Sequence, residues 1–188
     1  MNKHPKRKYI LLDRDGTIIE WKNYLDDPNQ VKLIPNAAEG LKSLIEMGFG
    51  LIVVTNQSGI GRGYFSEDTL NAIHQRMNGE LQKNSVVLDD IFYCPHKPED
   101  NCECYKPKTG LVQQAAWKFG FNPSECYVIG DNICDIELAK NINAVSILVL
   151  TGYGSSLQYE KSLKPDFIAN DLVNSAEIIK KLERLDDK

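Results

Sequence analysis

The sequence contains no hydrophobic run that approaches the roughly 18 apolar residues needed to cross a membrane. Its basic start, Met1–Lys8, is followed by only four apolar residues, whereas the hydrophobic region of a secretion signal has about 7–15. We therefore expect no membrane partner and a cytoplasmic location, with Met1–Lys8 forming a solvated tail.

Excess positive charge is also missing. The net charge of −4 argues against a general nucleic-acid-binding protein, because such proteins normally carry a basic excess. The chain also lacks internal repeats, low-complexity segments and linkers of the kind that separate domains. At 188 residues it is expected to form a single domain, residues 1–188, and to be a monomer without a large second domain.

The apolar segments are short, and stretches with helical periodicity lie between them. Continuously apolar strands that alternate with helices are typical of a doubly wound, mostly parallel Rossmann-like α/β sheet with helices on both faces. Helices are expected to begin at Pro35-Asn36, after the N-cap Ser66, near Leu111, at Ile133 and near Ala176. Strands are expected at Tyr9–Leu12, Phe49–Val54, Val86–Tyr93 or only its part Asp90–Tyr93, Cys126–Ile129, Val145–Leu150 and Asp166–Ala169. A turn, T-G-Y-G, is expected directly after Leu150.

Polar residues of a coherent kind follow four of these strands. The carboxyl ends of parallel strands lie at one edge of the sheet, where open α/β folds bind their ligands. Two acids at i and i+2, Asp13 and Asp15, suit a divalent cation and a phosphate, since one can attack while the other transfers protons. The residues at the other strand ends are Thr55 and Asn56, then Lys106, then Asp131 and Asp135.

D-R-D-G-T behind an apolar strand, followed in order by a threonine, a lysine and G-D-N-I-C-D, resembles the four motifs of the haloacid dehalogenase superfamily over residues 9–144. The resemblance implies a magnesium-dependent phosphatase, with Asp13 as nucleophile and Asp15 as general acid and base. Thr55 and Lys106 would contact the phosphoryl oxygens. Asp13, the backbone carbonyl of Asp15, and Asp131 would bind Mg²⁺.

Asp135 lies one helical turn beyond Asp131, on the same side of the expected helix. Two roles are open for it. It would either hold a metal-bound water or pair with the positive end of the helix dipole.

Three of the five cysteines crowd into the eleven residues of Cys94-x-His96-x5-Cys102-x-Cys104. In a chain without a recognised secretion signal, such crowding favours metal over disulfides, and a Cys₃His set suits structural zinc. The zinc loop 94–104 would hold the segment that delivers Tyr105 and Lys106. The alternative is free cysteines on a flexible loop, and Cys126 is expected to be an inert buried thiol.

The small zinc loop in place of a large cap domain, together with V-T-N-Q-S-G-I-G-R-G, is similar to the heptose bisphosphate phosphatase family, which serves nucleotide-activated heptose synthesis. The resemblance implies a small phosphorylated sugar as substrate. Histidinol-phosphate phosphatases share this zinc loop. They remain an alternative, as do another sugar-phosphate phosphatase, a polynucleotide 3′-phosphatase and a non-catalytic phosphate-binding protein.

Substrate contacts are expected in the loop after the first strand, in the glycine-rich segment, and around the motif lysine. The heptose family usually has basic residues where this chain has Tyr105 and Asn132. Recognition of the distal group, the part of the substrate that carries the second phosphate, is therefore expected to differ. Trp21 and Tyr24 would either touch substrate or only pack their loop down, and His74 is expected to be structural or exposed. The full predicted set is Arg14, Trp21, Lys22, Asn23, Tyr24, Thr55, Asn56, Gln57, Ser58, Arg62, Tyr105, Lys106 and Asn132, with Lys22 and Arg62 as candidates to replace the missing charge.

Overall fold

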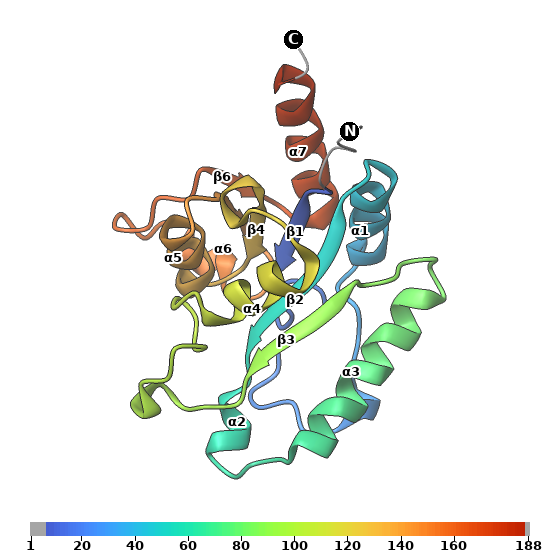
Figure 1. The fold of residues 1–188 in the computed structure, drawn as a ribbon. Coiled ribbons are helices and arrows are strands. Elements are labelled where there is room, and N and C mark those ends of the chain that lie inside the picture. Colours follow the sequence, from blue (N-terminus) through green and yellow to red (C-terminus); the bar gives the residue numbers. More distant parts are fainter. Residues whose placement is uncertain (1–6, 187–188) are drawn as a thin grey trace.

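The computed structural model describes residues 7–186, with side chains to residue 184, and is built on a parallel sheet (Figure 1). The sheet has six strands in the order β3-β2-β1-β4-β5-β6, and every neighbouring pair is parallel. This confirms the predicted Rossmann-like sheet. Strands are added toward one edge from β1 to β3 and toward the other from β4 to β6, so the strand order reverses between β1 and β4. The strands are β1 (Tyr9–Leu12), β2 (Gly50–Asn56), β3 (Asp90–Cys94), β4 (Tyr127–Gly130), β5 (Val145–Val149) and β6 (Phe167–Ala169).

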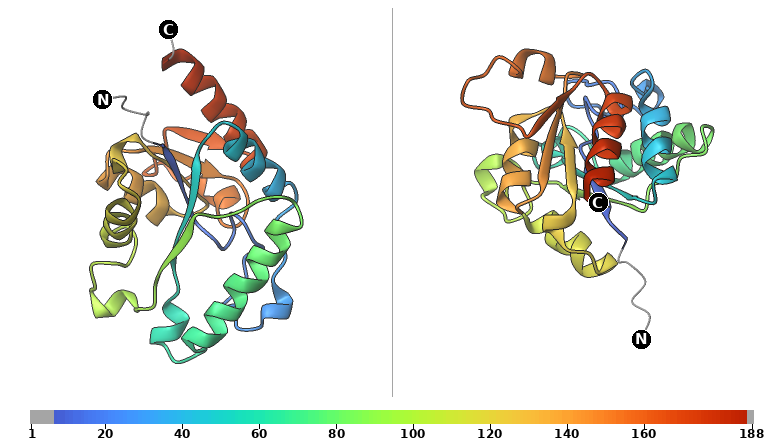
Figure 2. Two further views of the ribbon diagram at one scale, coloured as in Figure 1. Left: turned by 45° about the vertical axis from the view of Figure 1, so that its right-hand side comes forward. Right: turned by 90° about the horizontal axis from the view of Figure 1, so that it is seen from above.

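Helices cover both faces of the sheet, as the two further views show (Figure 2). One buried apolar cluster joins alternate strand residues to α1, α3 and α7, and a second joins the opposite strand face to α4 and α5. The central strands β1, β2 and β4 are buried on both sides, which explains why their sequences are largely apolar. The helices are α1 (Ala37–Glu46), α2 (Ser58–Gly61), α3 (Glu67–Gln82), α4 (Gly110–Phe119), α5 (Ile133–Asn141), α6 (Gly154–Leu157) and α7 (Leu172–Asp186), with short 3₁₀ turns at Pro28–Gln30, Pro98–Asp100 and Pro123–Glu125.

Local sequence signals explain where the helices beside the pocket begin. The side chain of Ser66 accepts a hydrogen bond from the backbone of Thr69 and caps α3, as predicted. The expected bounds of α5 also hold, because Asn132 and Asp135 form a reciprocal capping box at its first turn. Strand β2 runs two residues beyond its predicted end and therefore includes Thr55 and Asn56.

The last two residues of the predicted basic tail, Arg7 and Lys8, contact the folded domain. Arg7 pairs with Asp89 at 2.6 Å, and Lys8 pairs with Glu183 at 2.8 Å. Residues 1–6 lie outside the described part of the chain. No helix within residues 7–186 combines the length and the hydrophobicity that a membrane crossing requires.

Candidate active site

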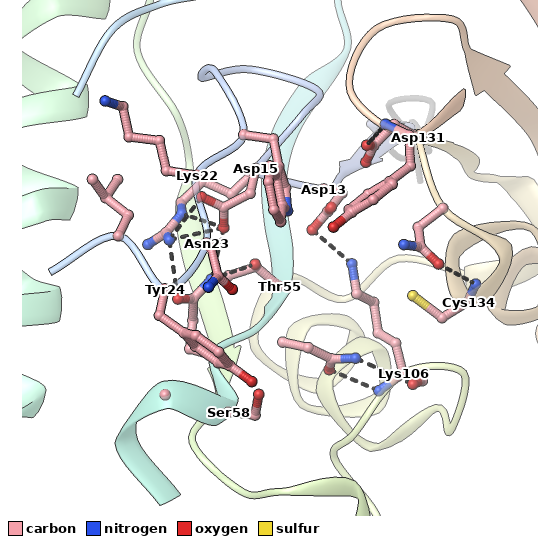
Figure 3. A pocket seen from close by; sticks show the side chains of 18 of the residues that line it. Asp13, Asp15, Lys22, Asn23, Tyr24, Thr55, Ser58, Lys106, Asp131 and Cys134 are labelled. Carbon is pink, nitrogen blue, oxygen red and sulfur yellow. Dashed lines mark hydrogen bonds and ion pairs between the residues drawn. The ribbon is translucent and has the colours of Figure 1, made fainter. Parts of the chain in front are cut away.

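A pocket of about 400 Å³ opens at the carboxyl ends of the central strands (Figure 3). Its volume falls in the range typical of small-molecule sites. Two residues predicted for substrate or magnesium, Arg62 and Asp135, are not part of its lining, and neither are the four predicted zinc ligands. The lining combines the predicted residues Asp13, Arg14, Asp15, Trp21, Lys22, Asn23, Tyr24, Thr55, Asn56, Gln57, Ser58, Tyr105, Lys106, Asp131 and Asn132 with Leu25, Gly59, Phe65, Cys134 and Tyr153, which were not anticipated.

Lys106 lies at the centre of the charged groups and is only 2% exposed. Its ammonium group donates to Asp13 Oδ1 at 2.8 Å and to Asp135 Oδ1 at 2.7 Å. Burial alone would lower the pKa of Lys106, but the charges of Asp13 and Asp135 outweigh it and raise that pKa above its ordinary value. The lysine is therefore a fixed cation directly beside the Asp13 carboxylate, as Figure 3 shows.

Asp135 is buried below the pocket floor. Its second carboxylate oxygen accepts from the backbone N–H of Asn132 at 3.1 Å, while its first binds Lys106. The contact with Asn132 matches the second role expected for Asp135, which is pairing with the positive N-terminus of α5. The contact with Lys106 was not anticipated. Asn132, expected to touch substrate, lines the pocket and also caps α5.

Asp131 is held in a narrow space between two glycines. Its Oδ2 accepts from the backbone N–H of Tyr153 at 2.7 Å. A Cβ atom on Gly16 would lie 2.2 Å from that oxygen, and one on Gly152 would lie 2.1 Å from it. Both glycines also have positive φ angles, of 81° and 52°, which side chains disfavour. A side chain at either glycine would therefore displace the Asp131 carboxylate.

Three carboxylates, those of Asp13, Asp131 and Asp135, have an oxygen within 4.8 Å of one another. Burial, and then the nearby charge of Asp13, raise the pKa of Asp131 to about 8. Such a crowd of acids is stabilised in its ionised form by a divalent cation, and carboxylate oxygens are the donors that Mg²⁺ prefers. The residues present thus fit the predicted magnesium.

Arg14 has contacts that differ from its expected role in substrate binding. Its guanidinium group forms a two-pronged contact with its neighbour Asp15, from Nε to Oδ2 and from one terminal nitrogen to Oδ1, both at 3.0 Å. Gln57 strengthens the same arrangement, because its amide donates to Asp15 at 2.9 Å and accepts from Arg14 at 3.0 Å. The arginine is 1% exposed, so its charge is committed to Asp15.

The glycine-rich segment after β2 divides its polar groups between the pocket and the protein. The hydroxyl of Thr55 lines the pocket and accepts from the Gln57 amide at 2.9 Å. Asn56 turns to Lys106 instead, where it binds both backbone polar groups of that residue. Ser58 lines the pocket at the start of α2.

The four predicted zinc ligands converge. The sulfur and nitrogen atoms of Cys94, His96, Cys102 and Cys104 all lie within 4.8 Å of one another, and the two sulfurs of Cys94 and Cys104 are 3.1 Å apart. Three sulfurs and one imidazole nitrogen in this spacing suit tetrahedral zinc. The cluster is also joined to the glycine-rich segment by backbone hydrogen bonds. Gln57 donates to the Cys94 carbonyl at 2.7 Å, and Gly61 donates to the Pro95 carbonyl at 2.8 Å.

Aromatic side chains border the mouth of the pocket. Trp21 meets Tyr153 edge to face at 4.9 Å between ring centroids, and Tyr24 meets Tyr64 at 4.6 Å. Trp21 and Tyr24 remain 44% and 38% exposed, so they pack the loop and still present surface to a ligand. Tyr153 was missed because T-G-Y-G predicts a turn and says nothing of the direction of its side chain.

The two candidate cations for the distal group are placed differently. Lys22 lines the pocket, and its ammonium group donates to the side chain of Gln30 at 3.3 Å. Arg62 pairs with Glu99 of the zinc loop at 3.5 Å, outside the lining.

Comparison with known proteins connects this geometry to a family. A family model described as HAD-hydrolase-like matches residues 103–175. A D-glycero-beta-D-manno-heptose-1,7-bisphosphate 7-phosphatase from Haemophilus ducreyi is 38% identical over 175 residues, covering 89% of this chain and 96% of that protein. The chain belongs to the heptose-1,7-bisphosphate 7-phosphatase family. This confirms the resemblance predicted from the motifs, and it identifies the protein as a phosphatase.

Other members of the heptose bisphosphate phosphatase family support the assignment. A probable member from Thermoplasma volcanium is 42% identical over 136 residues, covering 72% of this chain and 93% of that protein. The crystal structure of the D,D-heptose 1,7-bisphosphate phosphatase from B. bronchiseptica, complexed with magnesium and phosphate, has a TM-score of 0.87 at 31% identity. It covers 93% of this chain and 98% of the other.

Proposed function

We propose that this protein removes the 7-phosphate of D-glycero-D-manno-heptose 1,7-bisphosphate through an aspartyl-phosphate formed on Asp13. The observation that carries the proposal is the convergence of Asp13, Lys106 and Asp131 from three different strand ends into one pocket. The names of the relatives supply the substrate class, and a small phosphorylated sugar fits a pocket of about 400 Å³.

The reaction divides into two displacements at phosphorus. A carboxylate oxygen of Asp13 attacks the phosphorus, and the bond from phosphorus to the sugar oxygen breaks while Asp15 gives that oxygen a proton. Asp15 then takes a proton from water, whose oxygen attacks the same phosphorus and frees inorganic phosphate and Asp13. Lys106 and the hydroxyl of Thr55 offset the charge that develops on the phosphoryl oxygens.

A magnesium ion would be held by Asp13, the backbone carbonyl of Asp15, and Asp131. It would reduce the repulsion between a dianionic phosphate and the attacking carboxylate. Zinc in the Cys₃His cluster would be structural, because four protein ligands leave no position for water. The zinc would stabilise the pocket through the backbone hydrogen bonds that join the cluster to Gln57 and Gly61.

The distal phosphate has a limited choice of cations. Arg14 is committed to Asp15, and Lys106 is committed to Asp13 and Asp135. Lys22 is the third cationic side chain in the lining, and its ammonium group contacts the neutral side chain of Gln30. It is thus the residue best placed to contact the second phosphate, with Trp21 and Tyr24 offering aromatic surface to the sugar ring.

The chain's location is inferred to be the cytoplasm. None of the five cysteines forms a disulfide, which fits a reducing compartment. The predicted monomer stays a prediction.

A substrate panel tests the proposal. Purified protein with magnesium would be compared, by kcat/KM, on both anomers of the heptose bisphosphate, histidinol phosphate and a 3′-phosphorylated oligonucleotide. We expect one heptose anomer to be preferred, and no turnover above background by Asp13→Asn. A preference for histidinol phosphate by more than about tenfold, or 1.4 kcal/mol, would favour the second candidate function.

A further inference from the structure

His74 lies behind the active site, on the helix that covers one face of the sheet. It belongs to α3 and is 7% exposed, and it does not line the pocket. Its ring nitrogen Nε2 is 3.1 Å from a terminal nitrogen of Arg14. The imidazole is therefore in contact with the group that binds Asp15, without being able to touch a substrate itself.

The direction of this hydrogen bond is fixed by chemistry. Arg14 has only donors, so Nε2 of His74 must accept and cannot carry a proton. Burial, and then the positive charge of Arg14, lower the pKa of His74 to about 3, which keeps the imidazole neutral. A neutral acceptor satisfies the arginine without competing for its charge.

Each nitrogen of the Arg14 guanidinium then has a hydrogen-bond partner. One side faces Asp15 through two parallel contacts, one terminal nitrogen also reaches Gln57, and the other terminal nitrogen reaches His74. Without His74, a donor of a buried cation would lose its partner. The planar group would then be free to tilt toward another acceptor, and Asp15 would move with it, because the two-pronged contact couples their orientations.

We propose that His74 is a positioning residue for Asp15, acting through Arg14 to aim that carboxylate at the leaving-group oxygen. The inference rests on the proposed function, in which Asp15 protonates the leaving alkoxide. If Asp15 is out of position, the rate of phosphoryl transfer should fall most for the substrates whose leaving group most needs that proton.

This dependence on the leaving group separates positioning from general damage to the fold. A sugar alkoxide is a poor leaving group and requires protonation, whereas p-nitrophenolate leaves without it. Because kcat/KM covers only the steps through the first irreversible one, release of p-nitrophenol isolates the phosphoryl transfer from the later hydrolysis.

The test compares kcat/KM on an alkyl sugar phosphate and on p-nitrophenyl phosphate, each with saturating magnesium. For His74→Leu we expect a loss of roughly tenfold or more on the sugar phosphate and a change within about twofold on the aryl ester. His74→Gln should restore most of the loss, since a glutamine oxygen can reach the Nε2 position. His74→Ala also lacks an acceptor and is measured alongside, so that the test stands if the leucine variant does not fold.

Two controls separate the possible failures. Met77→Leu alters a buried residue one turn further along α3 and should lower neither activity. Asp15→Asn should show the same selectivity as His74→Leu, only larger. An unselective Asp15→Asn would refute the acid role and the inference with it. A selective Asp15→Asn beside an unselective His74→Leu would overturn the inference alone.

Discussion

Asn56 holds the backbone of Lys106 by two hydrogen bonds: its side-chain oxygen accepts from the Lys106 N–H at 2.9 Å, and its amide donates to the Lys106 carbonyl at 3.2 Å. The pair joins the end of β2 to the segment that follows the zinc cluster. The site of the lysine is thus set by a neighbouring strand as well as by its own carboxylate partners.

Replacing Asn56 by alanine should therefore move Lys106 away from Asp13. We expect kcat to fall roughly tenfold, because small displacements of a charged group in a closed site are costly. Loss of the two hydrogen bonds should reduce the free energy of unfolding by about 1–3 kcal/mol. Steady-state kinetics and urea titration measure both effects. Asn84→Ala, which removes one exposed side-chain contact to Glu80, is the matched control; equal kinetics in the two variants would contradict the assignment.

Gly152→Ala should disable the acid cluster. The added Cβ would meet Oδ2 of Asp131 at 2.1 Å, and the backbone there has a positive φ of 52°. We expect magnesium to bind at least about tenfold more weakly, since a displaced carboxylate loses its geometry as a ligand. Isothermal titration of magnesium measures this. Gly79→Ala, in the interior of α3 with open space around it, should raise stability by about 0.5–1 kcal/mol and leave magnesium affinity alone.

Stability should depend on pH through Asp131. Its folded pKa of about 8 lies above the unfolded value of about 3.9, so the folded protein holds this proton more tightly than the unfolded chain does. The contribution is full below about pH 4 and is lost as the pH rises through about 8. We therefore expect the magnesium-free protein to have a lower Tm at about pH 8 than at about pH 6.

Magnesium should reverse this trend, because it binds the ionised carboxylates. Thermal melts of chelator-free protein, with and without magnesium, should show a larger gain in Tm at the higher pH. In Asp131→Asn both the pH dependence and the magnesium gain should shrink. An equal magnesium gain at both pH values in the unsubstituted protein would speak against the acid cluster as the binding site.

Loss of zinc should weaken phosphate binding indirectly. Cys102→Ser removes one ligand of the cluster, whose backbone is hydrogen-bonded to Gln57 and Gly61. We expect lower zinc content by elemental analysis and a several-fold higher KM, a scale typical of disturbed site geometry. Cys126→Ala alters a buried thiol outside the cluster and should keep its zinc. An unchanged KM in a verified zinc-free variant would refute the link.

The strand ends were predictable because the apolar runs are continuous. Tyr9–Leu12 is buried on both faces, so its pattern shows where the strand stops and places Asp13 at the edge of the sheet. The same reasoning located Asp131, and local capping signals located the start of α5. It placed Thr55 just beyond a strand that in fact includes it, and Lys106, which lies beyond the zinc loop, was assigned from the family resemblance.

Side-chain partners were harder to foresee than positions. Arg14 stands between two acids and was expected to bind substrate, yet burial forces its charge to be paired within the protein. Two of its partners, Gln57 and His74, come from 43 and 60 residues away in the chain. Gln57 reaches Arg14 because β2 pairs with β1, and His74 reaches it because α3 packs against the sheet. Tyr153 escaped notice for a similar reason, since its backbone, rather than its side chain, holds Asp131.

Chemical trapping of the intermediate tests the central claim most directly. The protein would be mixed with saturating heptose bisphosphate and magnesium, denatured rapidly, and reduced with borohydride, which converts an aspartyl-phosphate into homoserine. Peptide mass spectrometry should then find homoserine at position 13, dependent on substrate and absent without it. Homoserine at another aspartate, or none while phosphate is being released at the normal rate, would contradict the assignment of Asp13 as the nucleophile.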